Sequence, residues 1–377
     1  MEQVFTNAEI VLPDSVVSGA VQVKDGLIAD ISTGSQSGED LDGDYLLPGL
    51  VELHTDHLES HYAPRPGVRW NKELAIQAHD AQMASSGVTT VFDCFRVGTD
   101  HDMTFDDGEM RDLAVSVMDA QKKGRLRCDH RIHLRCEVSA PDALTGFNDF
   151  IAHCPIGLAS LMDHAPGQRQ FKTMDQYTLY YQTQRGLSDE EFADFVAMRK
   201  LESQTYSRPH REAIAAACRA SGAVVASHDD ATLDHVEEAV LDGVLVAEFP
   251  TSVEAARASR ERGMSVLMGA PNVVRGGSHS GNIAASHLAE LELLDVLSSD
   301  YIPLSLICAP FMLADTQDAI SLADAVRMVS KTPAETVGMM DRGAIETGRR
   351  ADLVRVQRQG QNVPTVRAVW RGGNRVC

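Results

Sequence analysis

Short apolar runs recur along the middle of the chain and alternate with longer segments in which apolar residues return every three or four positions. Short buried runs predict strands, and a 3.6-residue period predicts amphipathic helices. Their alternation between residues 48 and 341 is typical of βα units built around a parallel sheet. We expect strands at residues 50–54, 89–93, 131–138, 157–163, 223–228, 243–249, 265–268 and 294–298.

Eight such units in one chain favour a closed (β/α)8 barrel of the TIM type over an open sheet. Helices are expected at residues 73–86, 110–123, 211–221, 253–262 and 284–291. Residues 169–210 are too long for an ordinary connection and predict a helical insertion. Its helices are expected at 174–184 and, after a capping-box pattern at Ser188 and Glu191, at 192–205. This insertion either covers the barrel mouth or forms a solvated hairpin or a dimer contact.

The two ends of the chain have a different pattern, of short strands broken by turns. Asp25 and Gly26 stand between two such strands and predict a hairpin. We expect residues 1–47 and 342–377 to pair into one small β-sandwich domain, and residues 48–341 to form the barrel domain.

Composition and charge narrow the classes of function. The chain has 377 residues, 44% of them hydrophobic, and a net charge of −20 from 54 acidic and 34 basic residues. A negative field disfavours nucleic acid and anionic membranes as partners. The sequence has no apolar run of about 18 residues, the length that a membrane span needs. Seven cysteines without a C-x-x-C pair favour a reducing compartment. We therefore expect a cytoplasmic protein whose partner is a small molecule.

Metal-capable side chains stand where the predicted strands end. Active sites of such barrels lie at the carboxyl ends of the strands. His54 and Asp56 end the first strand and share one face of it, because side chains alternate along a strand. A single histidine there is most often a polar end that water satisfies, but six of the eight strands end in such residues. The candidate metal ligands are His54, Asp56, Glu137, His164, His228 and Asp300.

Histidine nitrogens and carboxylate oxygens suit zinc, manganese or iron, and we expect one or two divalent ions per chain. Two ions bridged by a carboxylate lower the pKa of a bound water towards neutrality. Glu137 is the candidate bridge. Asp300, after the last strand, is the candidate catalytic residue that accepts the proton of this water, with metal ligation as its alternative role.

Arginines near the same strand ends suggest a pocket for an anion. A guanidinium group offers two parallel hydrogen bonds to a phosphate. The glycine-rich segment 269–282 predicts a loop whose backbone N–H groups would cradle phosphate. A single arginine is more often part of a surface salt bridge, but four near strand ends of an acidic protein favour an anion pocket. The candidate substrate-binding residues are Arg65, Arg69, Arg135, Arg169, Arg275, Ser278 and His279.

The residues that carry this chemistry also resemble a known family. The N-terminal strands, the run at 47–50 that leads into His54, and the segment 343–354 resemble the amidohydrolase superfamily. Further runs resemble those of its members that act on phosphorylated ribose in phosphonate breakdown; they lie at 52–56, 133–137, 160–170, 227–232, 269–282 and 298–301. The first strand has H-x-D where most members have H-x-H, and no strand ends in a lysine that could be carbamylated. The resemblance implies that Glu137 takes the bridging place.

The resemblance implies metal-dependent hydrolysis of α-D-ribose 1-methylphosphonate 5-triphosphate to the 5-phosphate and diphosphate, in the carbon–phosphorus lyase pathway. The alternative is an amidohydrolase or deaminase that cleaves a C–N bond of a small metabolite. The arginines distinguish the two, because a neutral base or ring amide does not need them. A third reading is a barrel without catalytic activity. Such a barrel would be expected to lack the metal-ligating residues, and here these residues are present together. The sequence is also compatible with a homodimer.

Overall fold

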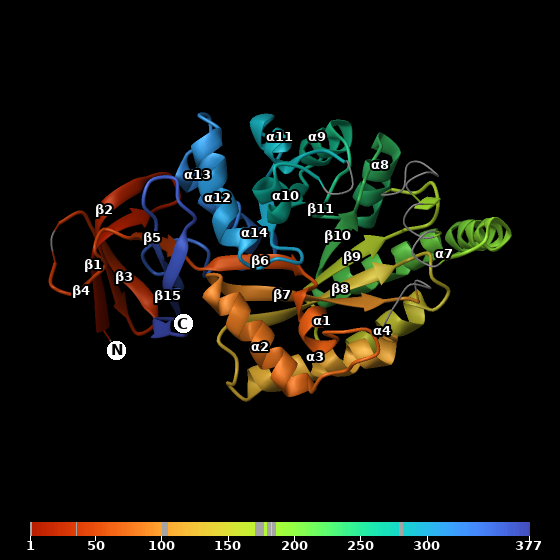
Figure 1. Ribbon diagram of the computed structural model, residues 1–377, viewed down its shortest axis with the longest axis horizontal. Helices are drawn as coiled ribbons and strands as arrows, with labels where there is room; N and C mark the ends of the chain where they lie inside the picture. Colours follow the sequence, from red (N-terminus) through yellow and green to blue (C-terminus); the bar gives the residue numbers. More distant parts are fainter. Residues whose placement is uncertain are drawn as a thin grey trace. The chain divides into compact units, whose positions relative to one another are not determined.

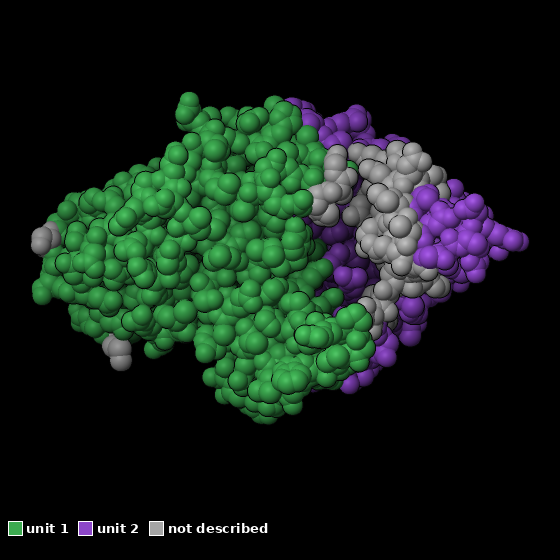
Figure 2. All heavy atoms as spheres, in the orientation of Figure 1, with its two compact units in different colours: residues 1–93, 116–131, 268–377 green, residues 94–115, 132–267 purple. Residues whose placement is uncertain are grey.

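The two ends of the chain and its middle supply strands to two different sheets (Figure 1). The computed structural model describes residues 2–34, 36–99, 105–169, 177–178, 182, 186–278 and 282–377. The chain divides into two compact units (Figure 2). Unit 1 comprises residues 1–93, 116–131 and 268–377, and unit 2 comprises residues 94–115 and 132–267. The domain boundaries expected near residues 47 and 342 stay a prediction.

The chain ends form one hydrogen-bonded sheet within unit 1. Its order is β16-β15-β14-β5-β1-β2-β3, with β4 beside β1. The antiparallel pair of β5 and β14, with Pro48 opposite Leu353, joins the two ends as predicted. The expected hairpin is present, with Asp25 and Gly26 at φ 51° and 82°. The strands are β1 (Glu2–Val11), β2 (Val16–Lys24), β3 (Leu27–Ser32), β4 (Glu39–Asp40), β5 (Tyr45–Pro48), β14 (Leu353–Gln357), β15 (Thr365–Arg371) and β16 (Asn374–Arg375).

The middle of the chain forms an eight-stranded sheet in which the strands follow one another in sequence order. These strands are β6 (Leu50–Thr55), β7 (Val88–Val97), β8 (Asp129–Glu137), β9 (Leu158–Met162), β10 (Val224–His228), β11 (Val246–Glu248), β12 (Ser265–Gly269) and β13 (Val296–Ser298). A parallel bridge between Thr55 and Asp300 joins the end of the first strand to the residues after the last. The sheet is thus a nearly closed barrel, and all eight expected strands are confirmed.

Helices separate these strands along the chain. Four of the expected helices are confirmed within a few residues, as α2, α3, α9 and α11. The helices are α1 (His57–Tyr62), α2 (Lys72–Ser85), α3 (Asp107–Lys122), α4 (Ala143–His153), α7 (Asp189–Ser221), α8 (Leu233–Asp242), α9 (Val253–Glu261), α10 (Ala270–Arg275), α11 (Ala285–Glu290), α12 (Ser305–Thr316), α13 (Leu322–Arg327) and α14 (Lys331–Thr336).

Helix α7 corrects the sequence prediction for the insertion. It begins at the predicted capping box of Ser188 and Glu191 and ends at Gly222, whose φ is 78°. The expected separate helices at 192–205 and 211–221 are wrong, because α7 continues through Pro209. A proline inside a helix costs about 3 kcal/mol. Buried side chains on both sides of it, such as Ser203 and Ile214, offset this cost. The helix expected at 174–184 lies almost entirely outside the described residues.

The cysteines carry no disulfides in this structure. All seven cysteines are free thiols, six of them buried and Cys377 exposed. No helix among the described residues has the length and apolarity needed to cross a bilayer.

A buried ion-pair network in unit 1 ties the C-terminal segment to the starts of two barrel strands. Arg342 Nη1 donates to Asp129 Oδ2 at 2.6 Å and to Thr90 Oγ1 at 3.0 Å. Arg350 Nη1 reaches the same Asp129 oxygen at 3.4 Å and pairs through its other nitrogens with Asp352. Burial would raise the pKa of Asp129, but Arg342 and Arg131 lower it to about 2.

This network predicts a loss of stability for Asp129→Asn. The carboxyl pKa falls from 3.8 to about 2 on folding, so the carboxylate stabilises the fold above pH 4 and this contribution is lost as the pH falls through 2. We expect Asp129→Asn to lower the free energy of unfolding by about 2 kcal/mol at pH 7 and by roughly half as much at pH 3. Urea titrations of the wild type and the variant at both pH values measure this difference in the free energy of unfolding. An equal loss of stability at pH 7 and at pH 3 would contradict the prediction.

Candidate active site

Histidines and carboxylates gather at strand ends in each unit. In unit 2 the cluster consists of His164, His228 and Asp229 (the His164 cluster). His164 follows β9, and His228 ends β10. Asp229 Oδ2 lies 3.5 Å from His228 Nε2 and 3.8 Å from His164 Nε2. One nitrogen of each ring therefore faces the same carboxylate oxygen.

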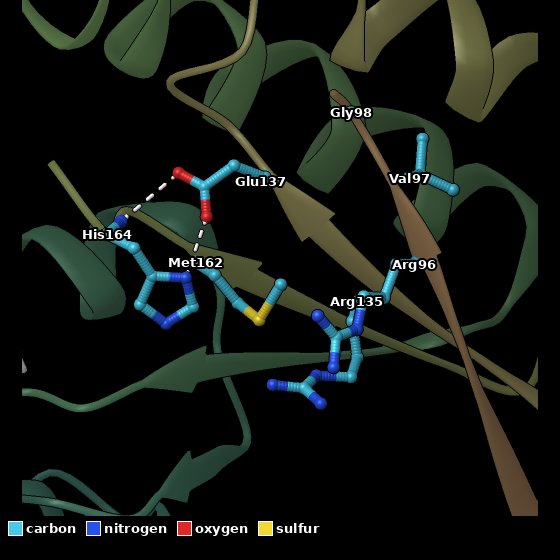
Figure 3. A pocket seen from close by; sticks show the side chains of 7 residues that line it. All are labelled: Arg96, Val97, Gly98, Arg135, Glu137, Met162 and His164. Carbon is cyan, nitrogen blue, oxygen red and sulfur yellow. Dashed lines mark hydrogen bonds and ion pairs between the residues drawn. The ribbon is translucent and has the colours of Figure 1, made fainter. Parts of the chain in front are cut away.

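The other nitrogen of each ring faces a second carboxylate. His228 Nδ1 lies 3.1 Å from Glu248 Oε2, at the end of β11. His164 Nδ1 lies 2.8 Å from Glu137 Oε2, at the end of β8 (Figure 3). A carboxylate only accepts, so in the neutral form of each ring Nδ1 carries the proton and Nε2 has the lone pair. This is how carboxylates orient metal-binding histidines.

The geometry of the His164 cluster fits a divalent ion. Asp229 Oδ2 is buried and has no hydrogen-bond partner among the described residues. Its distances to the two Nε2 atoms are long for hydrogen bonds. Two ligand atoms on one tetrahedral zinc ion, with bonds of about 2.1 Å, lie roughly 3.4 Å apart. The same three side chains have ligand atoms within 4.8 Å of one another, so the donor set fits zinc, manganese or iron.

Glu137 is held firmly on its other side. Oε1 accepts from the backbone N–H of His164 at 3.1 Å and from Arg199 Nη2 at 3.5 Å, and Ser139 Oγ donates to it as well. Arg199, on α7, is only 1% exposed. Burial would raise the pKa of Glu137, but the charges of His164 and Arg199 lower it to about 2. In this arrangement Glu137 orients His164, and its bridging role stays a prediction.

A second line of hydrogen bonds supports Glu248. Ser160 Oγ donates to Glu248 Oε2 at 2.6 Å and also contacts His133 Nε2. The other nitrogen of His133 lies 3.4 Å from Cys94 Sγ. All of these side chains except Cys94 are fully buried. Glu248 and thereby His228 are fixed by packing and hydrogen bonds from three strands of unit 2.

Two arginines line the pocket beside Glu137 and His164. The pocket is formed by Arg96, Val97, Gly98, Arg135, Glu137, Met162 and His164. Figure 3 shows the guanidinium groups of Arg96, from β7, and Arg135, from β8, next to each other. Burial would raise the pKa of Asp229, but His228 and His164 lower it. Arg135 lowers the pKa of Asp229 further. The pocket therefore brings His164, one member of the metal-capable cluster, beside positive charge suited to phosphate.

In unit 1, His54, Asp56 and Asp300 come together where the barrel closes. His54 Nε2 lies 3.9 Å from Asp56 Oδ1. The backbone N–H groups of Asp56 and Asp300 donate to the carbonyl oxygens of Asp300 and His54, at 3.2 and 3.1 Å. Thr55 Oγ1 donates to the Asp300 carbonyl at 2.9 Å. Beneath them Glu52 is completely buried, and burial raises its pKa to about 7.

Both units use an unusual backbone conformation at these strand ends. Asp229 has a φ of 57°, Phe249 of 52° and Asp300 of 53°. These are left-handed conformations, which few residues other than glycine adopt readily. Such conformations at several strand ends are typical of functional sites.

The chain matches the amidohydrolase family over residues 182–377, which is more than half of its length. It is also 46% identical to the α-D-ribose 1-methylphosphonate 5-triphosphate diphosphatase of Escherichia coli (strain K12), over 99% of this chain and 100% of that protein. The chain belongs to the amidohydrolase family.

Solved amidohydrolase structures share its fold. An amidohydrolase from an environmental sample of the Sargasso Sea matches with a TM-score of 0.66 at 16% identity, over 100% of this chain and 93% of that one. An N-acetylglucosamine-6-phosphate deacetylase from Pasteurella multocida matches with a TM-score of 0.64 at 15% identity, over 100% and 99% of the two chains. At such identities the likeness concerns the fold.

The structure places the predicted arginines in different surroundings. Arg135 lines the pocket beside Glu137 and His164. Arg169 is buried and paired with Asp230 and Glu238, so its side chain serves an internal network. Arg65 and Arg69 are exposed, and Arg69 lies 5.9 Å from the centre of the Tyr62 ring.

The glycine-rich segment after β12 corrects another expectation. Residues 270–275 were expected to be loop, but they form helix α10, with Pro271 in its first turn. Arg275 ends this helix and is exposed, and Ser278 beyond it is half-buried. His279 lies outside the described residues. The substrate role of Arg275, Ser278 and His279 stays a prediction.

Four residues that the structure brings into the unit 2 site were not predicted from the sequence: Asp229, Glu248, Arg96 and Arg199. Asp229 and Glu248 stand at strand ends that were recognised, but no spacing rule singled them out. Arg96 was missed because β7 extends to Val97, beyond its expected end at residue 93. Nothing in the sequence indicated that Arg199, inside the insertion, would reach Glu137.

Proposed function

We propose that this amidohydrolase hydrolyses α-D-ribose 1-methylphosphonate 5-triphosphate to the 5-phosphate and diphosphate, as a step of phosphonate breakdown in the cytoplasm. The observation that carries the proposal is the 46% identity over the whole chain to the Escherichia coli diphosphatase. The pocket with Arg96, Arg135 and His164 supports it, because its charge suits a phosphorylated substrate.

The two clusters are the proposed metal ligands, with one or two divalent ions per chain, of which zinc is the first candidate. In unit 2, His164, His228 and Asp229 would hold an ion, and Glu137 and Glu248 orient the two histidines. In unit 1, His54 and Asp56 would hold an ion. Divalent ions at these positions would supply Lewis acidity and lower the pKa of a bound water.

The remaining side chains have separate tasks in the reaction. Asp300 accepts the proton of the attacking water. Arg96 and Arg135 donate hydrogen bonds to phosphate oxygens, which offsets negative charge as the bond between the α- and β-phosphoryl groups breaks. The buried Arg199 keeps Glu137 ionised, so that His164 holds one orientation.

The proposal is tested by product analysis with metal-analysed protein. We expect release of diphosphate from α-D-ribose 1-methylphosphonate 5-triphosphate, its abolition by a chelator, and its return on addition of zinc or manganese. Release of orthophosphate would show that a different bond is cleaved. Metal-loaded protein that is inactive on the triphosphate but hydrolyses a cyclic amide or deaminates a base would favour the C–N hydrolase alternative.

Asp300→Asn should separate proton transfer from metal binding. The amide keeps the size of the side chain and, like aspartate, tolerates the left-handed backbone at this position. General base catalysis is worth about 100-fold to 10,000-fold, so we expect kcat to fall by that factor. Metal content, measured by mass spectrometry of the purified variant, should stay at the wild-type value. Full activity would remove Asp300 from this role, and loss of an ion would make it a ligand.

Arg96→Gln should weaken binding of the triphosphate. A hydrogen bond to a charged group is worth about 1.5–3 kcal/mol, so we expect KM to rise roughly 10-fold to 100-fold. Arg367→Gln is the matched control, because Arg367 is exposed on β15 and bonds to Gln357. Steady-state kinetics of both variants measure KM for the triphosphate. An unchanged KM for Arg96→Gln would show that the phosphate groups bind elsewhere.

A further inference from the structure

Four polar side chains lie along one face of helix α7 in unit 2, and the proposed reaction uses only the first of them. Arg199, Ser203, Ser207 and His210 follow one another at intervals of four, four and three residues. Side chains at such intervals share one side of a helix. Ser207 is half-buried and the other three are buried, so this face is turned towards the rest of unit 2. Buried polar groups are costly unless they find hydrogen-bond partners.

The two ends of this polar face bind to the end of strand β8. Arg199 Nη2 donates to Ser139 Oγ at 3.0 Å and to Glu137 Oε1 at 3.5 Å. His210 Nδ1 lies 3.1 Å from the carbonyl oxygen of Val138. These contacts lie about three turns apart along the helix. They fix the stretch of α7 between them against the strand ends of unit 2.

The two serines of that stretch bind Asp163, the residue directly before His164. Ser203 Oγ donates to Asp163 Oδ2 at 2.7 Å, and Ser207 Oγ donates to the same oxygen at 2.6 Å. The other oxygen, Oδ1, accepts from the backbone N–H of Ala165 at 3.0 Å. An aspartate that bonds to the backbone two residues on closes a tight turn. The Asp163 carboxylate therefore connects α7 to the backbone on both sides of His164.

His164 is thus fixed by its ring and by its main chain separately. Its ring pairs with Glu137 through Nδ1, at 2.8 Å. Strand β9 ends at Met162, so His164 lies beyond the last residue of the strand. The turn that Asp163 closes is what sets the course of the main chain here. Asp163 is only 6% exposed, and its two serine donors hold it in that turn.

We propose that Asp163 and the two serines of α7 are positioning residues for the metal ligand His164. The proposal rests on the proposed function only in taking His164 as a ligand of an ion of the zinc class. Such an ion binds tightly only where the ligand atoms already lie at suitable distances and angles. Without the two hydroxyl groups, Asp163 Oδ2 loses both donors, and the turn around His164 is free to relax. The expected result is weaker binding of the ion at an unchanged set of ligands.

The test is the zinc affinity of the full chain, measured by titration in competition with a chromophoric chelator. His164→Gln is the reference, because the part of the titration that it abolishes belongs to the His164 cluster. Mutation of the partners that hold a metal ligand costs roughly 10-fold to 100-fold in affinity, and we expect this loss for the double variant Ser203→Ala, Ser207→Ala. Thr205→Ala is the matched control, because Thr205 is exposed on α7 and donates to the Leu201 carbonyl. It should bind zinc as the wild type does.

A rescue experiment separates positioning from a general effect on stability. Ser207→Ala removes one donor and should weaken zinc binding on its own. Ser207→Thr keeps the hydroxyl group at a half-buried position and should bind zinc as the wild type does. Cobalt gives a second measure, since its visible absorption depends on the geometry of its ligands. This absorption should change in the double variant at saturating cobalt and stay unchanged in Thr205→Ala. If the double variant does not fold, the two single variants of Ser207 make the same comparison.

Two results would overturn the proposal. Folded double variant with the zinc affinity and cobalt absorption of the wild type would show that the serines only stabilise α7. A titration that His164→Gln leaves unchanged would show that His164 is not a ligand. Diphosphate release is not measured, so protein that binds zinc but acts on another substrate gives the same titrations. Failure of the proposed reaction and failure of this proposal are therefore distinguishable.

Discussion

The close pairing of a histidine with a buried carboxylate is the constraint on which the candidate sites depend. Glu137 behind His164 and Glu248 behind His228 each fix which ring nitrogen keeps its lone pair. A buried carboxylate is costly unless it is paired, so these pairs cannot rearrange cheaply. The ring orientations are therefore properties of the folded chain, present before any ion binds.

The barrel delivers these pairs because parallel strands end at one edge. Glu137 ends β8, His164 follows β9, His228 ends β10 and Glu248 ends β11. Each partner in a pair thus comes from a neighbouring or nearby strand, and the strand register sets their distance. In unit 1 the bridge between Thr55 and Asp300 has the same effect, because it sets Asp300 beside the end of β6.

Much of the fold and part of the site followed from the sequence. All eight strands were predicted because buried parallel strands are almost continuously apolar, as in β9, where every residue is buried. Helix α7 was divided wrongly because the burial that carries it past Pro209 is a tertiary effect. His54, Asp56, Glu137, His164 and Asp300 were recognised by their place at strand ends. Arg96 and Arg199 were not, because pairing across the fold has no signal in a single sequence.

The left-handed backbone at Asp229 and Asp300 has a consequence for how this chain can change. Aspartate and asparagine tolerate that conformation far better than glutamate or most other residues. At both positions the peptide geometry has already reduced the set of acceptable side chains to a few short polar ones and glycine. Of that set, only aspartate is an anion at neutral pH. The left-handed backbone and the need for an anion thus each favour aspartate at these two positions. A change that removes only one of these requirements still leaves aspartate favoured by the other.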